Sequence, residues 1–455
     1  MALNRNIFRE YDIRGVADVD LFDADIEDLG RAIGTYLRRT SGGDLALGRD
    51  TRLSSPRLRD ALVRGLLATG CNVRDAGVVP TPLLYYAVVH LKATGGVMIT
   101  GSHNPPEHNG FKIVSGGGTI HGEAIQEILA IAERRDFESG EGKLEAVDVT
   151  TPYVEEIAAQ FRFARKIKVV ADAGNGVAGP ALHRLFEKLN VEPVELFFEM
   201  DGHFPNHHPD PTIPENIAQL IEKVKETDAE LGLAFDGDAD RLGAVDEHGN
   251  VLWGDQLLLL FARDILRVQP GATFIGEVKC SQVMYDEIRK LGGNAIMYRT
   301  GHSLIKARMK EVDAALGGEM SGHLFFADRY YGFDDALYAA CRLIEIVAQS
   351  GKPLSAQLEG LPKTFVTPEI RTDCPDETKF EVVGRVAAHF RQTHEVVEID
   401  GARILFPEGW GLVRASNTQP VLVSRFEAST PELLAQYQRD VESVLEEAKR
   451  PLPAP

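Results

Sequence analysis

The sequence predicts an α/β protein: three repeated mixed α/β domains, then a smaller C-terminal α+β domain, arranged around one central cleft. The first supporting observation is a strand–loop–helix–strand pattern that occurs three times, at residues 44–80, 167–197 and 272–299. Units of this kind build largely parallel sheets. The second is their spacing: the copies start roughly a hundred residues or more apart, so each has the size of a domain and not of a solenoid repeat.

Composition narrows the class of protein. The chain has 455 residues, 44% of them hydrophobic and 26% charged, as is usual for a globular protein with more than one core. A formal net charge of −19 argues against partners such as nucleic acid or an anionic membrane. The four cysteines are widely spaced without a C-x-x-C pair, which predicts reduced thiols in the cytoplasm. No apolar signal core and no run of about 18 apolar residues is present, so no membrane span is expected.

The first domain is expected over residues 1–148. After a polar opening loop, a helix is expected at about 23–39. The first copy of the repeat follows as a strand at 44–48, a helix that begins at Pro56 and a strand at 72–79. Proline at the start of a helix has the backbone angle that the first turn needs, which supports this boundary.

The later domains are delimited in the same way. The second and third copies of the repeat predict domains over 149–252 and 253–363. From about 365 the repeat stops, and the tail, 364–455, alternates short strands with two helices at about 381–392 and 431–450. This pattern is typical of an α+β domain.

A rigid loop follows a short apolar strand in the first domain. The loop reads TGSHNPP, and its prolines and glycine hold Ser102 and His103 in place, with Lys112 a few residues later. A fixed hydroxyl beside an imidazole and a cation suits covalent phosphoryl or acyl transfer. An ordinary surface turn is the alternative at this point.

Three aspartates form the corresponding loop of the second domain. Asp236, Asp238 and Asp240 alternate, so an extended backbone would direct them to one side. Converging carboxylates need a cation, and their hard oxygens suit Mg²⁺. An EF-hand is excluded because Arg241 stands where that motif needs glycine, and because a strand precedes the loop. A solvated acidic turn remains the alternative.

A glycine-rich loop suggests a competing function. Residues 174–179 match G-x-G-x-x-G between a strand and a helix, and Glu195 and Glu199 lie roughly 20 residues further on. A dinucleotide-dependent oxidoreductase would carry such a loop. The alternative is a glycine turn that lets the helix and the strand pack closely.

The third domain and the tail each add a polar loop. Glu319 and Ser321 could hydrogen-bond sugar hydroxyls, and His323 could move protons. His302 is either a proton shuttle or a structural loop histidine. The tail run Arg414–Thr418 combines a guanidinium, two hydroxyls and an amide, which suits phosphate, unless it is a capping turn. Since open α/β sheets bind ligands at the carboxyl ends of their strands, these loops predict one shared cleft.

Taken together, the motifs resemble the α-D-phosphohexomutase family, and within it the bacterial phosphomannomutase/phosphoglucomutase branch. YDIRG, TGSHNPP with NGFK, DGDADR, GEMSGH and RASNT occur in the family's order and approximate spacing, and DGHFPNHHPDP at 201–211 also matches. The resemblance covers nearly the whole chain. It implies the four-domain organisation and a role for each loop.

The resemblance assigns the site residues as follows. It implies that Ser102 is phosphorylated and, with Asp236, Asp238 and Asp240, holds one Mg²⁺, with Arg241 beside it. Residues implied to read the sugar hydroxyls are Glu319, Ser321 and His323. Residues implied to bind the substrate's non-reacting phosphate are Arg414, Ser416, Asn417 and Thr418. Residues implied to line the cleft and assist phosphoryl and proton transfer are Tyr11, Arg14, His103, Lys112, Lys279 and His302.

The implied reaction interconverts hexose 1-phosphate and hexose 6-phosphate, of mannose, glucose or both. It runs through a phosphoserine enzyme and a hexose 1,6-bisphosphate, which also acts as activator, with the tail as a mobile lid. The implied partners are small sugar phosphates, and a monomer is expected, with a dimer as alternative. Competing functions are a phosphoglucosamine mutase, against which Met320 argues, a sugar phosphatase using the same phosphoserine, and a non-catalytic sugar-phosphate-binding protein.

One residue departs from the family pattern. Related enzymes usually have glycine where Ala239 stands in the aspartate loop. If this position needs a positive φ angle, alanine would strain the loop.

Overall fold

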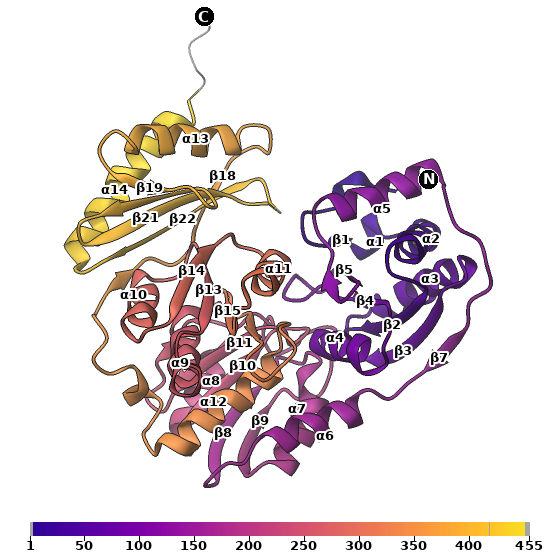
Figure 1. The fold of residues 1–455 in the computed structure, drawn as a ribbon, viewed down its shortest axis with the longest axis horizontal. Coiled ribbons are helices and arrows are strands. Elements are labelled where there is room, and N and C mark those ends of the chain that lie inside the picture. Colours follow the sequence, from indigo (N-terminus) through magenta and orange to yellow (C-terminus); the bar gives the residue numbers. More distant parts are fainter. Residues whose placement is uncertain (1–2, 418, 451–455) are drawn as a thin grey trace, which may run out of the picture.

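The computed structural model describes residues 3–417 and 419–450, which form four sheets, each flanked by helices (Figure 1). The predicted α/β repeats and the different tail are both confirmed. Within these residues, no helix is long and apolar enough to cross a membrane.

The first domain contains a mixed sheet in the order β1-β5-β4-β2-β3-β7, with β6 paired to β5. Strands β2, β3, β4 and β7 are parallel, and β5 runs antiparallel to β4 and β1. Its strands are β1 (Ile13–Val16), β2 (Asp44–Arg49), β3 (Asn72–Val78), β4 (Gly95–Ile99), β5 (His108–Ser115), β6 (Gly118–Thr119) and β7 (Leu144–Ala146). Its helices are a 3-10 turn (Arg5–Ile7), α1 (Ala17–Asp20), α2 (Asp23–Thr40), α3 (Ser55–Ala68), α4 (Thr81–His90) and α5 (Glu123–Arg134).

The second domain has a sheet in the order β12-β11-β10-β8-β9. Strand β8 is parallel to β9 and β10, whereas β11 returns antiparallel to β10. The strands are β8 (Ile167–Asp172), β9 (Val191–Leu196), β10 (Leu231–Phe235), β11 (Leu242–Asp246) and β12 (Val251–Leu252). The helices are α6 (Thr150–Gln160), α7 (Ala178–Lys188) and α8 (Ala218–Thr227).

The third domain repeats this plan with a shorter sheet, β14-β13-β15-β16. Strand β13 is parallel to β14 and β15, and β16 returns antiparallel to β15. The strands are β13 (Thr273–Glu277), β14 (Asn294–Tyr298), β15 (Leu316–Gly318) and β16 (Leu324–Phe326). The helices are α9 (Gly254–Val268), α10 (Gln282–Lys290), α11 (His302–Val312), α12 (Ala336–Ser350) and a 3-10 turn (Ser355–Leu358).

The C-terminal domain is an antiparallel sheet in the order β17-β22-β21-β20-β19, with β18 also paired to β22. Helices α13 (Lys379–Phe390) and α14 (Pro431–Ala448) cover the face of this sheet that is turned away from the third domain (Figure 1). The strands are β17 (Phe365–Val366), β18 (Ile370–Asp373), β19 (Glu395–Val397), β20 (Ala402–Phe406), β21 (Gly409–Ala415) and β22 (Val421–Ala428). Strand β22 pairs with β21 on one side and with β17 and β18 on the other.

The apolar cores explain how the domains hold together. One large cluster runs through the second and third domains and includes helix α4 of the first. The tail packs a core of its own, with Val386, Leu422 and Phe426 among its members. Between tail and third domain lies a small cluster of Val278, Trp410 and Leu412. The first three domains are therefore joined by continuous packing, and the tail is attached through a narrower contact.

Candidate active site

The three site loops occupy equivalent places in their sheets. Residues 100–107 connect β4 to β5, residues 236–241 connect β10 to β11, and residues 319–323 connect β15 to β16. In each case the loop follows the carboxyl end of a parallel strand, and the next strand returns antiparallel. Long-range hydrogen bonds, described below, bring the loops of the three domains into contact.

The serine loop is held by a buried arginine. The Arg52 guanidinium has no exposed side-chain surface and donates to the backbone carbonyls of Ser102, Asn104, Pro105 and His108. Its neighbour Asp50 accepts from Arg52 Nε at 3.1 Å and from the Gly101 amide at 3.0 Å. These bonds fix a loop in which Ser102 itself adopts a left-handed backbone with φ 49°.

The aspartate loop brings its carboxylates together, although not by the route expected from sequence. Oxygens of Asp236, Asp238 and Asp240 lie within 4.8 Å of one another, and all three residues are fully buried. The backbone is a turn and not extended, since the Ala239 amide donates to the Asp236 carbonyl at 3.0 Å. Ala239 has φ 61°, a positive φ that glycine would adopt without strain.

Ser102 directly contacts the aspartate loop. Its hydroxyl donates to Asp236 Oδ2 at 2.7 Å, and Asp236 Oδ1 accepts the amides of Asp240 and Arg241. Burial, together with the charges of Asp238 and Asp240, raises the pKa of Asp236 well above its usual range. The Ser102 hydroxyl thus lies against an acidic cluster from the next domain.

The first domain supplies the other partners of these carboxylates. Asp238 Oδ2 accepts from Thr81 at 2.6 Å, from Thr100 at 3.1 Å and from Lys112 Nζ at 2.7 Å. Lys112 Nζ also donates to Asp240 Oδ2 at 2.5 Å. Burial alone would lower the pKa of Lys112, but the two carboxylates outweigh it and raise that pKa well above its usual value. Lys112 is therefore a cation at any physiological pH.

The glycine-rich loop packs against other backbone. A Cβ on Gly176 would lie 2.7 Å from the Gly237 carbonyl oxygen, and one on Gly179 would lie 2.2 Å from that of Phe198. Gly237 in turn approaches Ser102, whose carbonyl oxygen would be 2.5 Å from an added Cβ. The glycines therefore allow the second-domain loops and the serine loop to pack closely, which favours the packing interpretation over a dinucleotide site.

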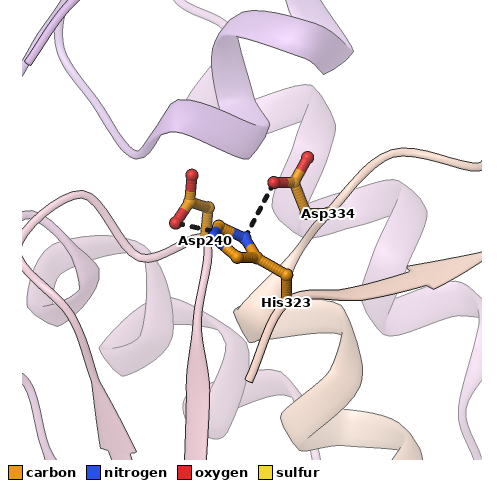
Figure 2. Close-up of side chains that lie close together, drawn as sticks. All are labelled: Asp240, His323 and Asp334. Carbon is orange, nitrogen blue, oxygen red and sulfur yellow. Dashed lines mark ion pairs between the residues drawn. The ribbon is translucent and has the colours of Figure 1, made fainter. Parts of the chain in front are cut away.

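His323 lies between two carboxylates (Figure 2). Its Nδ1 is 3.0 Å from Asp334 Oδ2 and 3.6 Å from Asp240 Oδ1. Its Nε2 accepts from Arg241 Nε at 3.1 Å. The ring of His302 stacks on that of His323 with centroids 5.5 Å apart. Burial, with the neighbouring Lys306, lowers the pKa of His302 well below its usual value, so its ring is neutral.

A second group of predicted residues gathers where the first, third and C-terminal domains meet. Asn417 donates to the Tyr11 hydroxyl at 2.8 Å, and that hydroxyl donates to the Thr300 carbonyl at 2.9 Å. Glu319 accepts the amide of Gly301 at 2.7 Å. Burial raises the pKa of Tyr11 to about 12 and also raises that of Glu319.

Two more cations belong to this region. Arg414 donates to Asp400 at 3.0 Å within the C-terminal domain. Lys279 of the third domain donates to Glu369 of the C-terminal domain at 3.2 Å. Ser416 accepts the amide of Gln419 at 3.1 Å. Thr418 lies outside the described residues.

The remaining predicted residues are Arg14 on strand β1, His103 in the serine loop and Ser321 in the 319–323 loop. Arg14 donates to the Asn104 side chain at 3.1 Å, next to the serine loop. The His103 ring is 3.2 Å from the Ser102 hydroxyl, and burial, followed by the charges of Arg241 and Arg14, lowers its pKa well below the usual range. Ser321 is partly buried in the 319–323 loop. The structure thus forms a serine–aspartate group and a Tyr11–Asn417 group, connected by the stacked histidines.

Models of four domains of one family match the chain in order. They are described as phosphoglucomutase/phosphomannomutase α/β/α domains I, II and III, at residues 5–139, 151–249 and 253–365, and the C-terminal domain at 369–444. The chain belongs to the phosphoglucomutase/phosphomannomutase family. This confirms the resemblance seen in the sequence.

Relatives of this phosphoglucomutase/phosphomannomutase family member match along its whole length. A phosphoglucomutase from Neisseria gonorrhoeae is 46% identical over 98% of both chains. A phosphomannomutase/phosphoglucomutase from Pseudomonas aeruginosa is 46% identical over 100% of this chain and 98% of that one. A crystal structure of a phosphoglucomutase/phosphomannomutase family protein from Burkholderia thailandensis superposes with a TM-score of 0.93 at 44% identity, over 100% of this chain and 99% of that chain.

Several residues of this family member's site were not found from its sequence. Asp50 and Arg52 lie in the loop after β2, where the rule that ligands bind at the carboxyl ends of strands could have indicated them. Thr81 and Thr100 look like ordinary helix-start and strand-end residues. Asp334 carries no sequence signal, because its partner His323 lies in the loop before β16 and the pairing exists only in the folded chain.

Proposed function

We propose that the protein is a phosphohexomutase that interconverts hexose 1-phosphate and hexose 6-phosphate through a phosphorylated Ser102. Family membership supports a mutase, a type of isomerase. The observation that carries the proposal is the 2.7 Å bond from the Ser102 hydroxyl to Asp236, at the junction of two domains. A serine rigidly held beside a buried acidic cluster can receive a phosphoryl group and stay close to the charges that neutralise it.

Members of the family depend on a metal ion, and the aspartate loop fits a hard divalent cation. We propose Mg²⁺, held by Asp236, Asp238, Asp240 and an oxygen of phosphorylated Ser102. The donors are all oxygens, and Asp238 Oδ1 is buried without a hydrogen-bond partner, as a metal ligand would be. When bound, the ion supplies positive charge to the transferring phosphoryl group.

Other residues would position the substrate. Arg414 and Asn417, with Ser416 and Thr418, offer donors for the phosphate that does not react, and Arg241 lies where it can contact the transferring group. Glu319 and Ser321 would accept or donate hydrogen bonds to sugar hydroxyls. His323 would carry the proton of the attacking hydroxyl.

The reaction needs two phosphoryl transfers with the sugar reversed in between. Ser102 first gives its phosphoryl group to the sugar, which forms a hexose 1,6-bisphosphate, and then takes back the other one. Added hexose 1,6-bisphosphate would therefore act as activator by phosphorylating Ser102. The buried cysteines Cys71, Cys280, Cys341 and Cys374 support a reducing, cytoplasmic setting.

The test combines intact mass with a coupled assay. Incubation with glucose 1,6-bisphosphate should add one phosphoryl group, which peptide mapping places on Ser102. The enzyme should then convert glucose 1-phosphate and mannose 1-phosphate to their 6-phosphates in the presence of Mg²⁺. Ser102→Ala should lose both properties, whereas Ser115→Ala, a serine of β5 away from the aspartate loop, should keep them.

Other outcomes would point elsewhere. Inorganic phosphate released without any hexose 6-phosphate would identify a phosphatase instead. Turnover of glucosamine 6-phosphate in preference to both hexose phosphates would identify a phosphoglucosamine mutase. A phosphorylated Ser102 without turnover of any of these sugars would contradict the proposal.

A further inference from the structure

Asp334 is a buried carboxylate at the centre of the site that the proposed function has not used. It is fully buried and lies two residues before helix α12. Its Oδ2 is 3.0 Å from His323 Nδ1, and its Oδ1 accepts from Lys306 Nζ at 2.8 Å (Figure 2 shows the His323 side). Oδ2 also lies 3.9 Å from His302 Nδ1, so Oδ1 faces the lysine and Oδ2 faces the two histidines, His323 being the nearer.

The hydrogen-bond partners of His323 determine which ring nitrogen carries the proton. Arginine can only donate, so the bond from Arg241 Nε requires a lone pair on His323 Nε2. A neutral ring then has its proton on Nδ1. That nitrogen faces Asp334, which is ionised because Lys306 and His323 outweigh burial and lower its pKa well below the usual range. An ionised carboxylate can only accept, so it stabilises this tautomer.

We propose that Asp334 is the positioning residue for His323: it holds the Nδ1–H tautomer and keeps Nε2 as the basic nitrogen of the site. This inference rests on the proposed function, in which His323 takes the proton of the attacking sugar hydroxyl. In that step the sugar oxygen bonds to phosphorus, the bond from phosphorus to Ser102 Oγ breaks and Oγ keeps its electron pair. In this step Arg241 turns to the transferring phosphoryl group and its N–H leaves His323 Nε2. The hydroxyl proton then moves to the freed Nε2, and Asp334 stabilises the resulting imidazolium.

Lys306 determines which oxygen of Asp334 faces His323. Its ammonium is buried, donates to Asp334 Oδ1 and to the Tyr85 hydroxyl at 3.3 Å, and lies 4.3 Å from the centre of the Tyr85 ring. The lysine therefore requires an acceptor at the Oδ1 position. Asp334 satisfies it and still presents a second acceptor to His323, which a neutral amide cannot do.

The first test is Asp334→Asn. Because Lys306 needs an acceptor, the amide oxygen should face Lys306 and the NH₂ group should face His323 Nδ1. The NH₂ group repels a proton on Nδ1, for which Asp240 Oδ1 at 3.6 Å is a more distant acceptor, and so moves the proton to Nε2, where it opposes the Arg241 N–H. We expect kcat for glucose 1-phosphate to fall by about 10²–10⁴-fold, as for a histidine held in the wrong tautomer, with KM changed by less than about threefold.

The neighbouring residue provides a matched control. Asp335 is equally buried, but its Oδ2 accepts from the hydroxyls of Tyr153 and Tyr330 and not from His323. Asp335→Asn should keep kcat within about twofold, since neither hydroxyl belongs to the site. Equal losses of kcat in both variants would overturn the proposal, because they would reflect general damage to this segment.

A double variant tests whether Lys306 determines which side-chain atom at position 334 faces His323. Lys306→Met removes the ammonium, so the amide of Asp334→Asn can turn its oxygen towards His323 Nδ1–H. The double variant should be roughly tenfold or more faster than Asp334→Asn alone, a strongly non-additive result. A double variant as slow as the single one, or slower, would contradict the assignment.

A measurement on the resting enzyme is independent of the reaction. Nitrogen-15 NMR of histidine-labelled protein, with the His323 signals identified by their loss in His323→Gln, reports which ring nitrogen is protonated. The proposal expects Nδ1–H in the wild type and Nε2–H in Asp334→Asn. The same tautomer in both proteins, or a doubly protonated wild-type ring, would overturn it. If no hexose phosphate is turned over, the proposed function fails while this measurement still decides the tautomer.

Discussion

At the scale of single residues, the site is defined by buried ion pairs. Lys112, Arg52 and Lys306 are all buried, and each contacts at least one buried aspartate. In a chain with a net charge of −19, these cations are gathered locally around the loops that would handle phosphate. Removing one partner of such a pair leaves an uncompensated buried charge, at a cost of about 3–5 kcal/mol.

Ala239 offers a test of backbone strain in the aspartate loop. Glycine there relieves about 1–2 kcal/mol of left-handed strain but loses a buried methyl group and gains unfolded-state entropy, each worth about 0.8 kcal/mol. The terms nearly cancel, so Ala239→Gly should change the free energy of unfolding by less than about 1 kcal/mol. Ala239→Val, β-branched at positive φ in a packed core, should cost more than about 2 kcal/mol.

The control for Ala239 is another fully buried alanine, Ala244 of β11, whose backbone has no positive φ. Ala244→Gly has no strain to relieve and should cost about 1 kcal/mol or more in denaturant unfolding. Equal losses for glycine at both positions would show that Ala239 is not strained.

Asp335 predicts a specific dependence of stability on pH. Burial raises the pKa of Asp335 to about 6, against an ordinary value of 3.8. Between these values the folded chain keeps a proton that the unfolded chain releases, so the contribution is fully present below about pH 4. It is lost as the pH rises through about 6, and amounts to about 3 kcal/mol. Between pH 4 and 7, the free energy of unfolding measured in urea should fall by about that much more for the wild type than for Asp335→Asn. Parallel plots of unfolding free energy against pH for the two proteins would refute this prediction.

At the scale of elements, the three site loops share one topological position, the reversal from a parallel strand to an antiparallel one. The repeated patterns predicted β2, α3 and β3, and also β8, α7, β13 and α10, because strong apolar runs and helix-start residues are local signals. The family resemblance placed Ser102 beside the aspartates through a shared Mg²⁺, and the Ser102 hydroxyl contacts Asp236. No local signal predicted the Asp334–His323 pair, since that contact depends on how the third domain folds. The aspartates were predicted to converge through an extended backbone, and the turn at Ala239 shows that the convergence has another cause.

The hydrogen bonds from Arg52 to the serine loop should be essential for stability and for activity. Arg52→Lys keeps the charge but cannot reproduce a planar fork that reaches several carbonyls. Loss of two or three bonds to a charged donor should lower the free energy of unfolding by about 3 kcal/mol, and kcat should fall at least about tenfold. Arg134→Lys, which alters one exposed ion pair with Glu127, should cost less than about 1 kcal/mol. Unchanged kcat in Arg52→Lys would contradict a positioning role.

At the scale of the whole molecule, the three repeated domains share continuous packing while the tail has its own core. The sequence indicated this division through the end of the repeat near residue 365. The shared cleft implied that the tail approaches the first domain, but the sequence could not indicate the bond from Asn417 to Tyr11 that makes the contact.

This arrangement predicts that substrate binding will order the tail. Glucose 1-phosphate, added with Mg²⁺, should slow amide hydrogen exchange in β20 and β21 and in residues 414–417, because the bound phosphate adds partners on that side. Exchange in α13 and α14, on the far face of the tail sheet, should change little and serves as the internal control. Exchange rates that stay the same throughout the tail would rule out a lid.

The hydroxyls of Thr81 and Thr100 reach into the second domain to hold Asp238, which makes the acidic cluster a property of two sequence segments more than 130 residues apart. An isolated second domain would lack those hydroxyls and the Lys112 ammonium, and its three carboxylates would face one another unrelieved. Chimeric enzymes built by exchanging segments between relatives should therefore exchange residues 81–112 and 236–241 together, because neither segment alone forms the paired acidic cluster.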